Sequence, residues 1–205
     1  MTNPYWHTAY KPHLVDAAEI RGLCFDLSNI VTASRSKQGT GEQRDPEDDP
    51  RFTHTERLCF QMAEDELSRR LLRLAVLIRT FDDIMANSPV ADAYRSHRDA
   101  AEKDVALGSV YTGDERITDT LRECCNKIIH ADDVRPTYET DDDRHDEFAR
   151  WGMTGMIELE GKLRGANWSI VICIDNLIEA VLDLLTFADQ MDELYRTTIP
   201  EGRIA

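Results

Sequence analysis

The sequence predicts a mainly helical protein: a bundle of four to five helices, with one β-hairpin inserted before the C-terminal helix. Two observations lead to this class. Over most of the chain, apolar residues recur at steps of three and four, which places them on one face of a helix. Near residue 153 this pattern gives way to short alternating or apolar runs, which are typical of strands. The chain has 205 residues, of which 41% are hydrophobic, so we expect one helical domain over 1–205 with a substantial core.

The first three helices are predicted from apolar stripes and boundary residues. Residues 13–35 carry a helical stripe that no proline interrupts, and residues 54–86 carry the strongest stripe in the chain. The members of that second stripe step by three or four residues: Leu67, Leu71, Leu74, Ile78, Phe81 and Met85. Ser88 and Pro89 form a cap and a favourable first helical residue, so a third helix is expected to run to about Leu107.

Two segments separate or end these helices. Residues 37–51 are hydrophilic and acidic and contain two glycines and two prolines, so we expect a disordered acidic loop there. Gly108 and Gly113 bracket a break, after which residues 115–131 are predicted to form a fourth helix. Pro136 ends any continuation of that helix.

The C-terminal part is predicted to contain the hairpin and the last helix. Two strand-like runs, 153–160 and 167–174, flank the segment GKLRGA, so we expect a β-hairpin within residues 150–175. Residues 176–196 return to a helical apolar stripe, and residues 198–205 are expected to be a frayed tail.

The composition restricts the function classes. The net charge is −15, which disfavours broad, nonspecific binding to nucleic acid. The five cysteines form no CxxC pair and no metal-binding spacing, which suits a reducing compartment. The N-terminus has no apolar signal region, and no apolar run reaches the length of a membrane span. We therefore expect a cytoplasmic protein without a membrane partner.

Residues 117–136 hold the most informative polar pattern. Arg122, Asn126 and His130 lie four residues apart, so on a helix they share one face. A histidine can transfer a proton near neutral pH, and an arginine can hold a phosphate through two parallel hydrogen bonds. This face can therefore serve metal-independent phosphoryl transfer. The alternative is structural, with His130 at the helix C-terminus and Asn126 bonded to the following loop.

The segment NKIIHA, residues 126–131, resembles the motif helix of the HEPN superfamily (higher eukaryotes and prokaryotes nucleotide-binding). Asn126 and His130 match the polar residue and the histidine of the family motif. Cys125 occupies the position at which the family has its arginine, and the nearest arginine before it is Arg122.

The resemblance implies a helical homodimer, and many members of the superfamily are ribonucleases of phage-defence or toxin–antitoxin systems. In that mechanism His130 is the general base or acid, Arg122 steadies the phosphate and Asn126 positions the ribose. Lys127 and Arg135 would then bind the RNA substrate. No metal and no cofactor would be needed.

Two other functions stay open. The first is a non-catalytic, acidic helical protein that serves as a scaffold and binds a basic protein partner or a second copy of itself. The second is a helical nucleotide pyrophosphohydrolase, which would need acidic residues on facing helices to hold magnesium. Asp82–Asp83 and Asp132–Asp133 are candidates for that role, but the chain has no clear ExxE pair.

Overall fold

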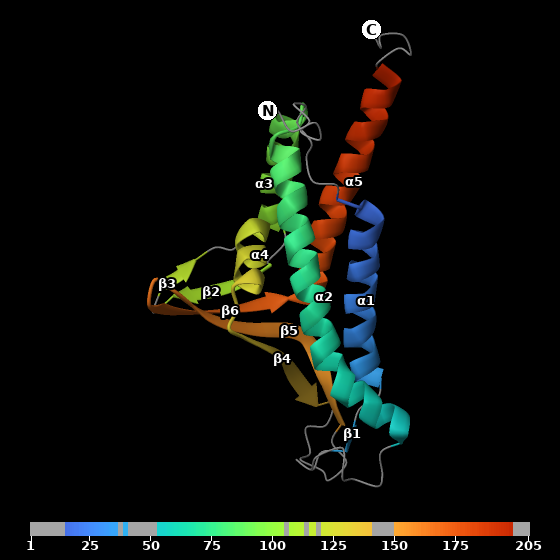
Figure 1. The fold of residues 1–205 in the computed structure, drawn as a ribbon, viewed down its shortest axis with the longest axis vertical. Helices are drawn as coiled ribbons and strands as arrows, with labels where there is room; N and C mark the ends of the chain where they lie inside the picture. Colours follow the sequence, from blue (N-terminus) through green and yellow to red (C-terminus); the bar gives the residue numbers. More distant parts are fainter. Residues whose placement is uncertain are drawn as a thin grey trace, which may run out of the picture.

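The computed structural model describes residues 15–36, 39–40, 53–104, 107–112, 115–117, 120–140 and 150–198. Within these residues the chain forms five helices and one six-stranded antiparallel sheet (Figure 1). The helices are α1 (Ala17–Ser36), α2 (His54–Ala86), α3 (Ala91–Asp104), α4 (Leu121–Ile129) and α5 (Ile174–Thr198). The strands are β1 (Gly39–Thr40), β2 (Gly108–Thr112), β3 (Glu115–Ile117), β4 (Asp133–Thr140), β5 (Arg150–Leu163) and β6 (Ala166–Cys173).

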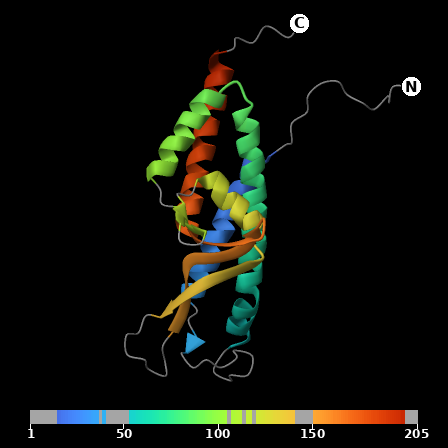
Figure 2. The same cartoon turned by 90° about the vertical axis from the view of Figure 1, so that its left-hand side faces the viewer.

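The long helices α1, α2 and α5 run along the long axis of the molecule, and the sheet crosses them on one side (Figures 1 and 2). Helix α1 packs against α2, α5 and β5, while α3 packs on α2 and α5. Helix α2 has the predicted bounds, and the first four residues of its predicted stripe are buried: Leu67, Leu71, Leu74 and Ile78. The helical part of the fold class is therefore confirmed.

The predicted hairpin is confirmed as β5 and β6, which pair in an antiparallel register from Met156↔Cys173 to Leu163↔Ala166. The two residues that connect them, Arg164 and Gly165, both have positive φ, of 52° and 85°. A type I′ hairpin turn requires positive φ at both of its central residues, and its twist matches that of the flanking strands.

The hairpin is part of a larger sheet than the sequence analysis predicted. The strand order is β1-β5-β6-β2-β3, and β4 pairs with β5 as well. Pro136, which was predicted to end the helical region, lies inside β4, and among the described strands β4 pairs only with β5. A strand at the edge of a sheet tolerates proline, because one side of its backbone needs no hydrogen-bonded partner. The predicted hairpin therefore accounts for only two of the six strands in the described sheet.

Several predicted boundaries also change. Residues 115–117 form β3, so the fourth helix begins only at Leu121 and the predicted helix over 115–131 was too long. The third helix ends at Asp104, before Leu107. Within the predicted loop 37–51, Gly39 and Thr40 pair with β5, and the rest of the loop lies outside the described residues. Of the predicted tail, Thr198 belongs to α5 and residues 199–205 lie outside the described residues.

The buried apolar side chains form one cluster that joins the helices to the sheet. Ile157 and Leu159 of β5 and Ile170 of β6 contribute from the sheet, and each is fully buried. The alternation of these residues along β5 and β6 places every second side chain on the helix-covered face. Because α4 packs on both α2 and β5, this core fixes the position of the polar face that the sequence singled out.

Candidate functional site

Helix α4 carries the predicted site, and side-chain acceptors fix its first turn. Thr120, the residue before the helix, accepts a hydrogen bond at Oγ1 from the backbone N–H of Glu123 at 3.2 Å. Oε1 of Glu102, on α3, accepts a second one from the backbone N–H of Leu121 at 2.9 Å. The first N–H groups of a helix have no partner inside the helix, so these acceptors define where α4 begins.

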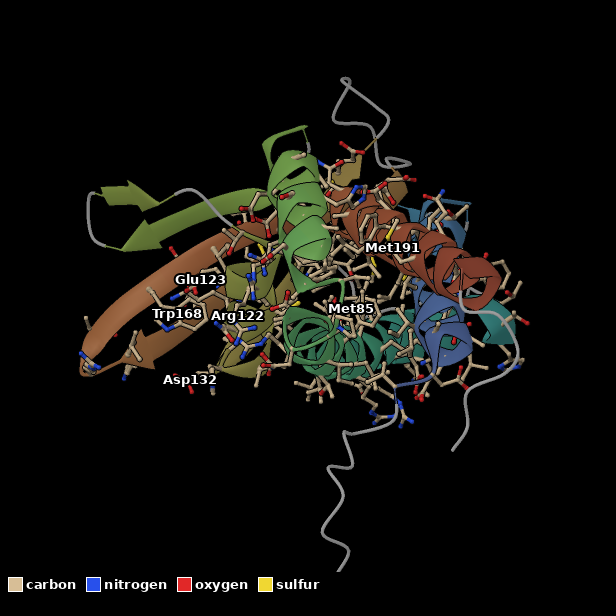
Figure 3. The ribbon with its side chains drawn as sticks, turned by 90° about the horizontal axis from the view of Figure 1, so that it is seen from above. Met85, Arg122, Glu123, Asp132, Trp168 and Met191 are labelled. Carbon is tan, nitrogen blue, oxygen red and sulfur yellow. The ribbon has the colours of Figure 1, made fainter. Side chains whose placement is uncertain are left out.

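Arg122 lies on the side of α4 that faces α2 (Figure 3). Its Nη1 forms ion pairs with two consecutive carboxylates of α2, contacting Asp82 and lying 2.8 Å from Oδ1 of Asp83. Asp82 is buried and accepts two further hydrogen bonds from α3, from Arg98 at 2.9 Å and from the Tyr94 hydroxyl at 3.1 Å. One buried carboxylate therefore joins α2, α3 and α4.

The pKa shifts in this cluster follow from its contacts. Burial raises the pKa of the Asp82 carboxyl, but the hydrogen bonds from Arg98 and Arg122 outweigh burial and hold that pKa below its usual range. The hydrogen bond to Asp83 is the largest cause that raises the pKa of Arg122. Burial, together with the nearby Asp82 charge, raises the pKa of Tyr94. Near neutral pH the carboxylate of Asp82 therefore stays charged, the guanidinium of Arg122 stays protonated, and the hydroxyl of Tyr94 stays neutral.

Asn126 belongs to the same contact between α4 and α2. Its Oδ1 accepts a hydrogen bond from the Arg79 guanidinium of α2, and its Nδ2 lies 3.5 Å from Oε2 of Glu123. The adjacent Cys125 is buried, and burial raises the pKa of its thiol to about 12. The position at which the HEPN pattern has an arginine therefore holds a neutral group that faces the core.

His130 stands apart from this network. It is the C-cap residue of α4, its backbone N–H donates to the carbonyl oxygen of Asn126 at 3.0 Å, and its side chain is exposed. It lies eight positions after Arg122, which corresponds to a rise of about 12 Å along a helix. The structure thus brings Arg122 and Asn126 together against α2 and leaves His130 outside their cluster.

The two predicted substrate-binding cations are also engaged in contacts within the chain. Lys127 is buried, lies 3.5 Å from Glu123, and places its Nζ 4.3 Å from the ring centroid of Trp168, a cation–π contact. Arg135 is exposed, and its Nη2 lies 2.5 Å from Asp133 and 3.2 Å from Glu160.

A polar groove of about 550 Å³ lies beside the end of α4, where the chain turns into β4 and meets the hairpin. Its lining includes three carboxylates, Asp132, Asp133 and Glu160, and one lysine, Lys162. This excess of negative charge repels a phosphate group. Among the residues that the structure describes, no group of three or more His, Cys, Asp or Glu side chains is placed to hold a metal ion.

The most unusual surface lies on α2. Six large apolar side chains are exposed in the described part of the chain, and four of them are on this one helix. Leu58, Met62, Leu72 and Val76 are each 42–56% exposed. With Asp65 and Arg69 between them, they step by 4, 3, 4, 3 and 4 residues along the side of α2 that points away from the core. We call these six residues the outer face of α2.

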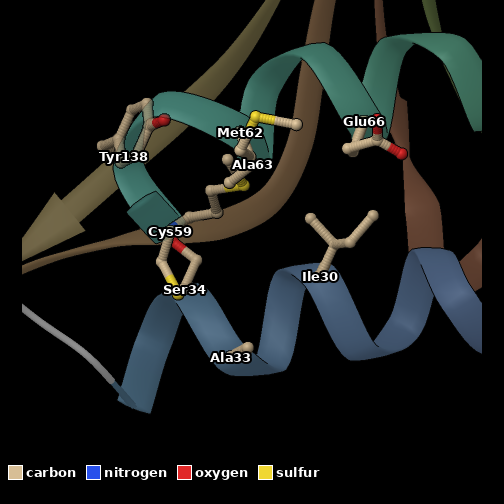
Figure 4. A pocket seen from close by; sticks show the side chains of 9 residues that line it. Ile30, Ala33, Ser34, Cys59, Met62, Ala63, Glu66 and Tyr138 are labelled. Carbon is tan, nitrogen blue, oxygen red and sulfur yellow. The ribbon is translucent and has the colours of Figure 1, made fainter. Parts of the chain in front are cut away.

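An apolar pocket of about 200 Å³ lies next to this face, between α1 and α2 (Figure 4). Ile30 and Ala33 of α1 and Met62 of α2 line it, and Tyr138 of β4 contributes to its lining (Figure 4). The Tyr138 hydroxyl donates a hydrogen bond to Glu64 of α2 at 2.5 Å. Met62 therefore belongs both to the pocket and to the outer face of α2.

The outer face of α2 was not predicted from the sequence, although its spacing is present there. A second heptad-like stripe ran along residues 54–86 opposite the core stripe, but its two central members are charged. The buried role of Asp82 had no comparable signal, because its partners lie 12, 16 and 40 residues further along the chain.

Comparison with protein-family models, with curated proteins and with solved structures found no match for this chain. No helix in the described residues is long and apolar enough to cross a membrane.

Proposed function

We propose that this chain is a non-catalytic helical interaction protein, which acts by binding another helix on the outer face of α2. One observation carries the proposal: four exposed apolar side chains follow a heptad spacing on the face of α2 opposite the core. Single exposed apolar residues are ordinary, but a contiguous stripe of them marks an interaction surface. A stripe at steps of four and three is the pattern that one helix presents to a partner helix.

The contacts of α4 support the same conclusion. Arg122 and Asn126 hold α4 against α2, with their polar atoms directed to Asp82, Asp83 and Arg79. A phosphate that recruited Arg122 would have to displace two carboxylates, one of them buried. The polar face that the sequence predicted is therefore best explained as a contact that stabilises the fold.

Light scattering on the purified full chain tests this proposal. We expect the wild-type protein to exceed the 23.4 kDa of one chain as its concentration rises. The double variant Leu72→Glu/Val76→Glu should stay at the mass of one chain, because it puts charges on the outer face of α2. Leu163→Glu is the matched control, because Leu163 is 62% exposed at the hairpin tip, away from this face. A double variant that associates as strongly as the wild-type chain would contradict the proposal.

A second candidate function is the metal-independent ribonuclease that the HEPN resemblance implies. The observation in its favour is the exposed side chain of His130, at the end of the motif helix and two residues from the groove residue Asp132. The test is cleavage of RNA in EDTA by the wild-type chain and by His130→Ala. Cleavage that survives EDTA and disappears in His130→Ala would establish this function and refute the non-catalytic one.

A further inference from the structure

We infer that the partner of the outer face of α2 is a second copy of the same chain, with the two α2 helices antiparallel and a two-fold axis at position 67. This inference rests on the proposed function and adds the identity and the register of the partner. It follows from a symmetry in the order of the six residues of this face. From either end, the order is two apolar residues, two charged residues and two apolar residues.

The symmetry extends to the spacing. Leu58 and Val76 are equally far from position 67, and so are Met62 and Leu72. Leu67 itself faces the core and is fully buried, so the axis passes through the opposite, exposed side of the helix. An antiparallel pair centred there places each apolar residue against an apolar residue of the second copy. Each such contact occurs twice, because a two-fold interface is self-complementary.

Charge complementarity selects this arrangement. Asp65 and Arg69 are also equally far from position 67, so the axis places Asp65 of each copy opposite Arg69 of the other. Within one chain, Arg69 lies 3.7 Å from Asp65, and both side chains are about two-thirds exposed, at 66% and 67%, so each can also contact a partner chain. A parallel pair would instead place Asp65 against Asp65 and Arg69 against Arg69. Like charges at the centre disfavour that alternative, and a polar central layer fixes the register.

The flanking residues agree with the antiparallel register. The same axis places Arg73 opposite Gln61 of the second copy, and Glu66 opposite Ser68. Neither pair brings like charges together. Steps of four and three also keep all six residues of the face on one seam, as helices that pair along their length require.

Charge reversal at the two central positions tests the inference. Asp65→Arg places two arginines against two arginines across the axis, and Arg69→Asp does the same with carboxylates. Each variant alone should weaken the self-association Kd by roughly 100-fold. The double variant Asp65→Arg/Arg69→Asp restores opposite charges, and its Kd should lie within about threefold of the wild-type value. An equimolar mixture of the two single variants should form a heterodimer. Sedimentation velocity measures all of these states, and circular dichroism confirms that each variant is folded.

The outcomes separate this inference from the proposed function. Suppose that Leu72→Glu/Val76→Glu abolishes association, and that the double reversal and the mixture associate as weakly as the single reversals. The outer face of α2 would then be the interaction surface, and the antiparallel register would be wrong. If the single reversals leave the Kd unchanged, the central charge pair is also excluded. If the wild-type chain does not associate with itself, the inference fails, whereas the proposed function fails only if no helical partner binds the outer face of α2.

Discussion

Asp82 is the residue on which the contact between α2, α3 and α4 depends most. It is buried and receives hydrogen bonds from Arg98, Tyr94 and Arg122. The cost of burying its charge is offset only while these donors remain in place. Asp83, the next residue, also pairs with Arg122 but is well exposed, so water can replace that contact.

We expect Asp82→Asn to lower the free energy of unfolding by about 3 kcal/mol, because the change leaves two arginines without their buried partner. Asp83→Asn is the matched control and should cost no more than about 1 kcal/mol, as exposed ion pairs do. Urea unfolding followed by circular dichroism measures both values. Equal losses in the two variants would show that burial does not distinguish these carboxylates.

The same carboxylate predicts a pH dependence. Its pKa is lower in the folded chain than in the unfolded one, so its contribution to stability is complete above the unfolded pKa, near 3.9. That contribution is lost as the pH falls through the lower folded value. The difference in unfolding free energy between wild type and Asp82→Asn should be constant from pH 7 to about 5 and shrink below about pH 4. A difference that does not change with pH would contradict the assigned pKa direction.

Gly161 is required where the hairpin meets α4. A Cβ atom at this position would lie 2.3 Å from Trp168 Cζ2 and 3.0 Å from the carbonyl oxygen of His130. The indole is buried under Lys127 and cannot move freely. Gly161→Ala should therefore destabilise the chain by about 1–3 kcal/mol. Gly22→Ala is the control: it meets nothing within 4 Å on α1 and should stabilise the chain by up to about 1 kcal/mol. Thermal unfolding distinguishes the two directions.

Helix α4 is short, with nine residues, so its first turn matters for its position. Thr120→Ala removes the Oγ1 acceptor of the Glu123 N–H and should cost about 1 kcal/mol. Thr186→Ala in the middle of α5 is the control; its hydroxyl donates to the backbone oxygen of Leu182, and its loss should be neutral or slightly stabilising. Hydrogen exchange of the α4 amides reports the loss locally, and unchanged exchange rates would show that Glu102 alone suffices as the cap.

At the scale of elements, some helices and strands could be predicted from patterns within their own segments, and others could not. Residues 54–86 and the hairpin could be predicted, because their apolar periods and the glycine-containing turn lie within each segment. The other strands could not be predicted in this way, because β2 is stabilised by pairing with the distant β6, β3 has only three residues, and β4 contains a proline. No helix continues through Pro136, as predicted, and the position of β4 at the sheet edge permits a proline inside that strand.

The candidate site shows the same division. The spacing of Arg122 and Asn126 correctly indicated one face of a helix. What that face contacts depended on Asp82 and Arg79, and no local pattern places these α2 residues against α4. The spacing of the residues on the outer face of α2 can be recognised in the sequence. Their exposure cannot, because only the fold shows which side of a helix faces solvent.

At the scale of the whole molecule, the fold leaves α2 with one buried apolar face and one exposed stripe that is largely apolar. The buried face contacts the common core of helices and sheet, and the exposed stripe runs from Leu58 to Val76. Figure 1 shows α2 running the length of the molecule, with α1 on one side and α4 on the other. A second α2 on the outer face would make this helix the centre of the assembly. The proposed function would then depend on a surface that two chains share.

Disulfide trapping across the proposed axis tests this account most directly. Position 62 of one copy should face position 72 of the other, so a mixture of Met62→Cys and Leu72→Cys chains should form a covalent dimer on mild oxidation. Either variant alone should not, because the two copies of one position lie about 15 Å apart along the helix axis. The wild-type chain controls for its own cysteines. If either variant alone cross-links as readily as the mixture, or if the mixture does not cross-link, the antiparallel pairing of α2 is wrong.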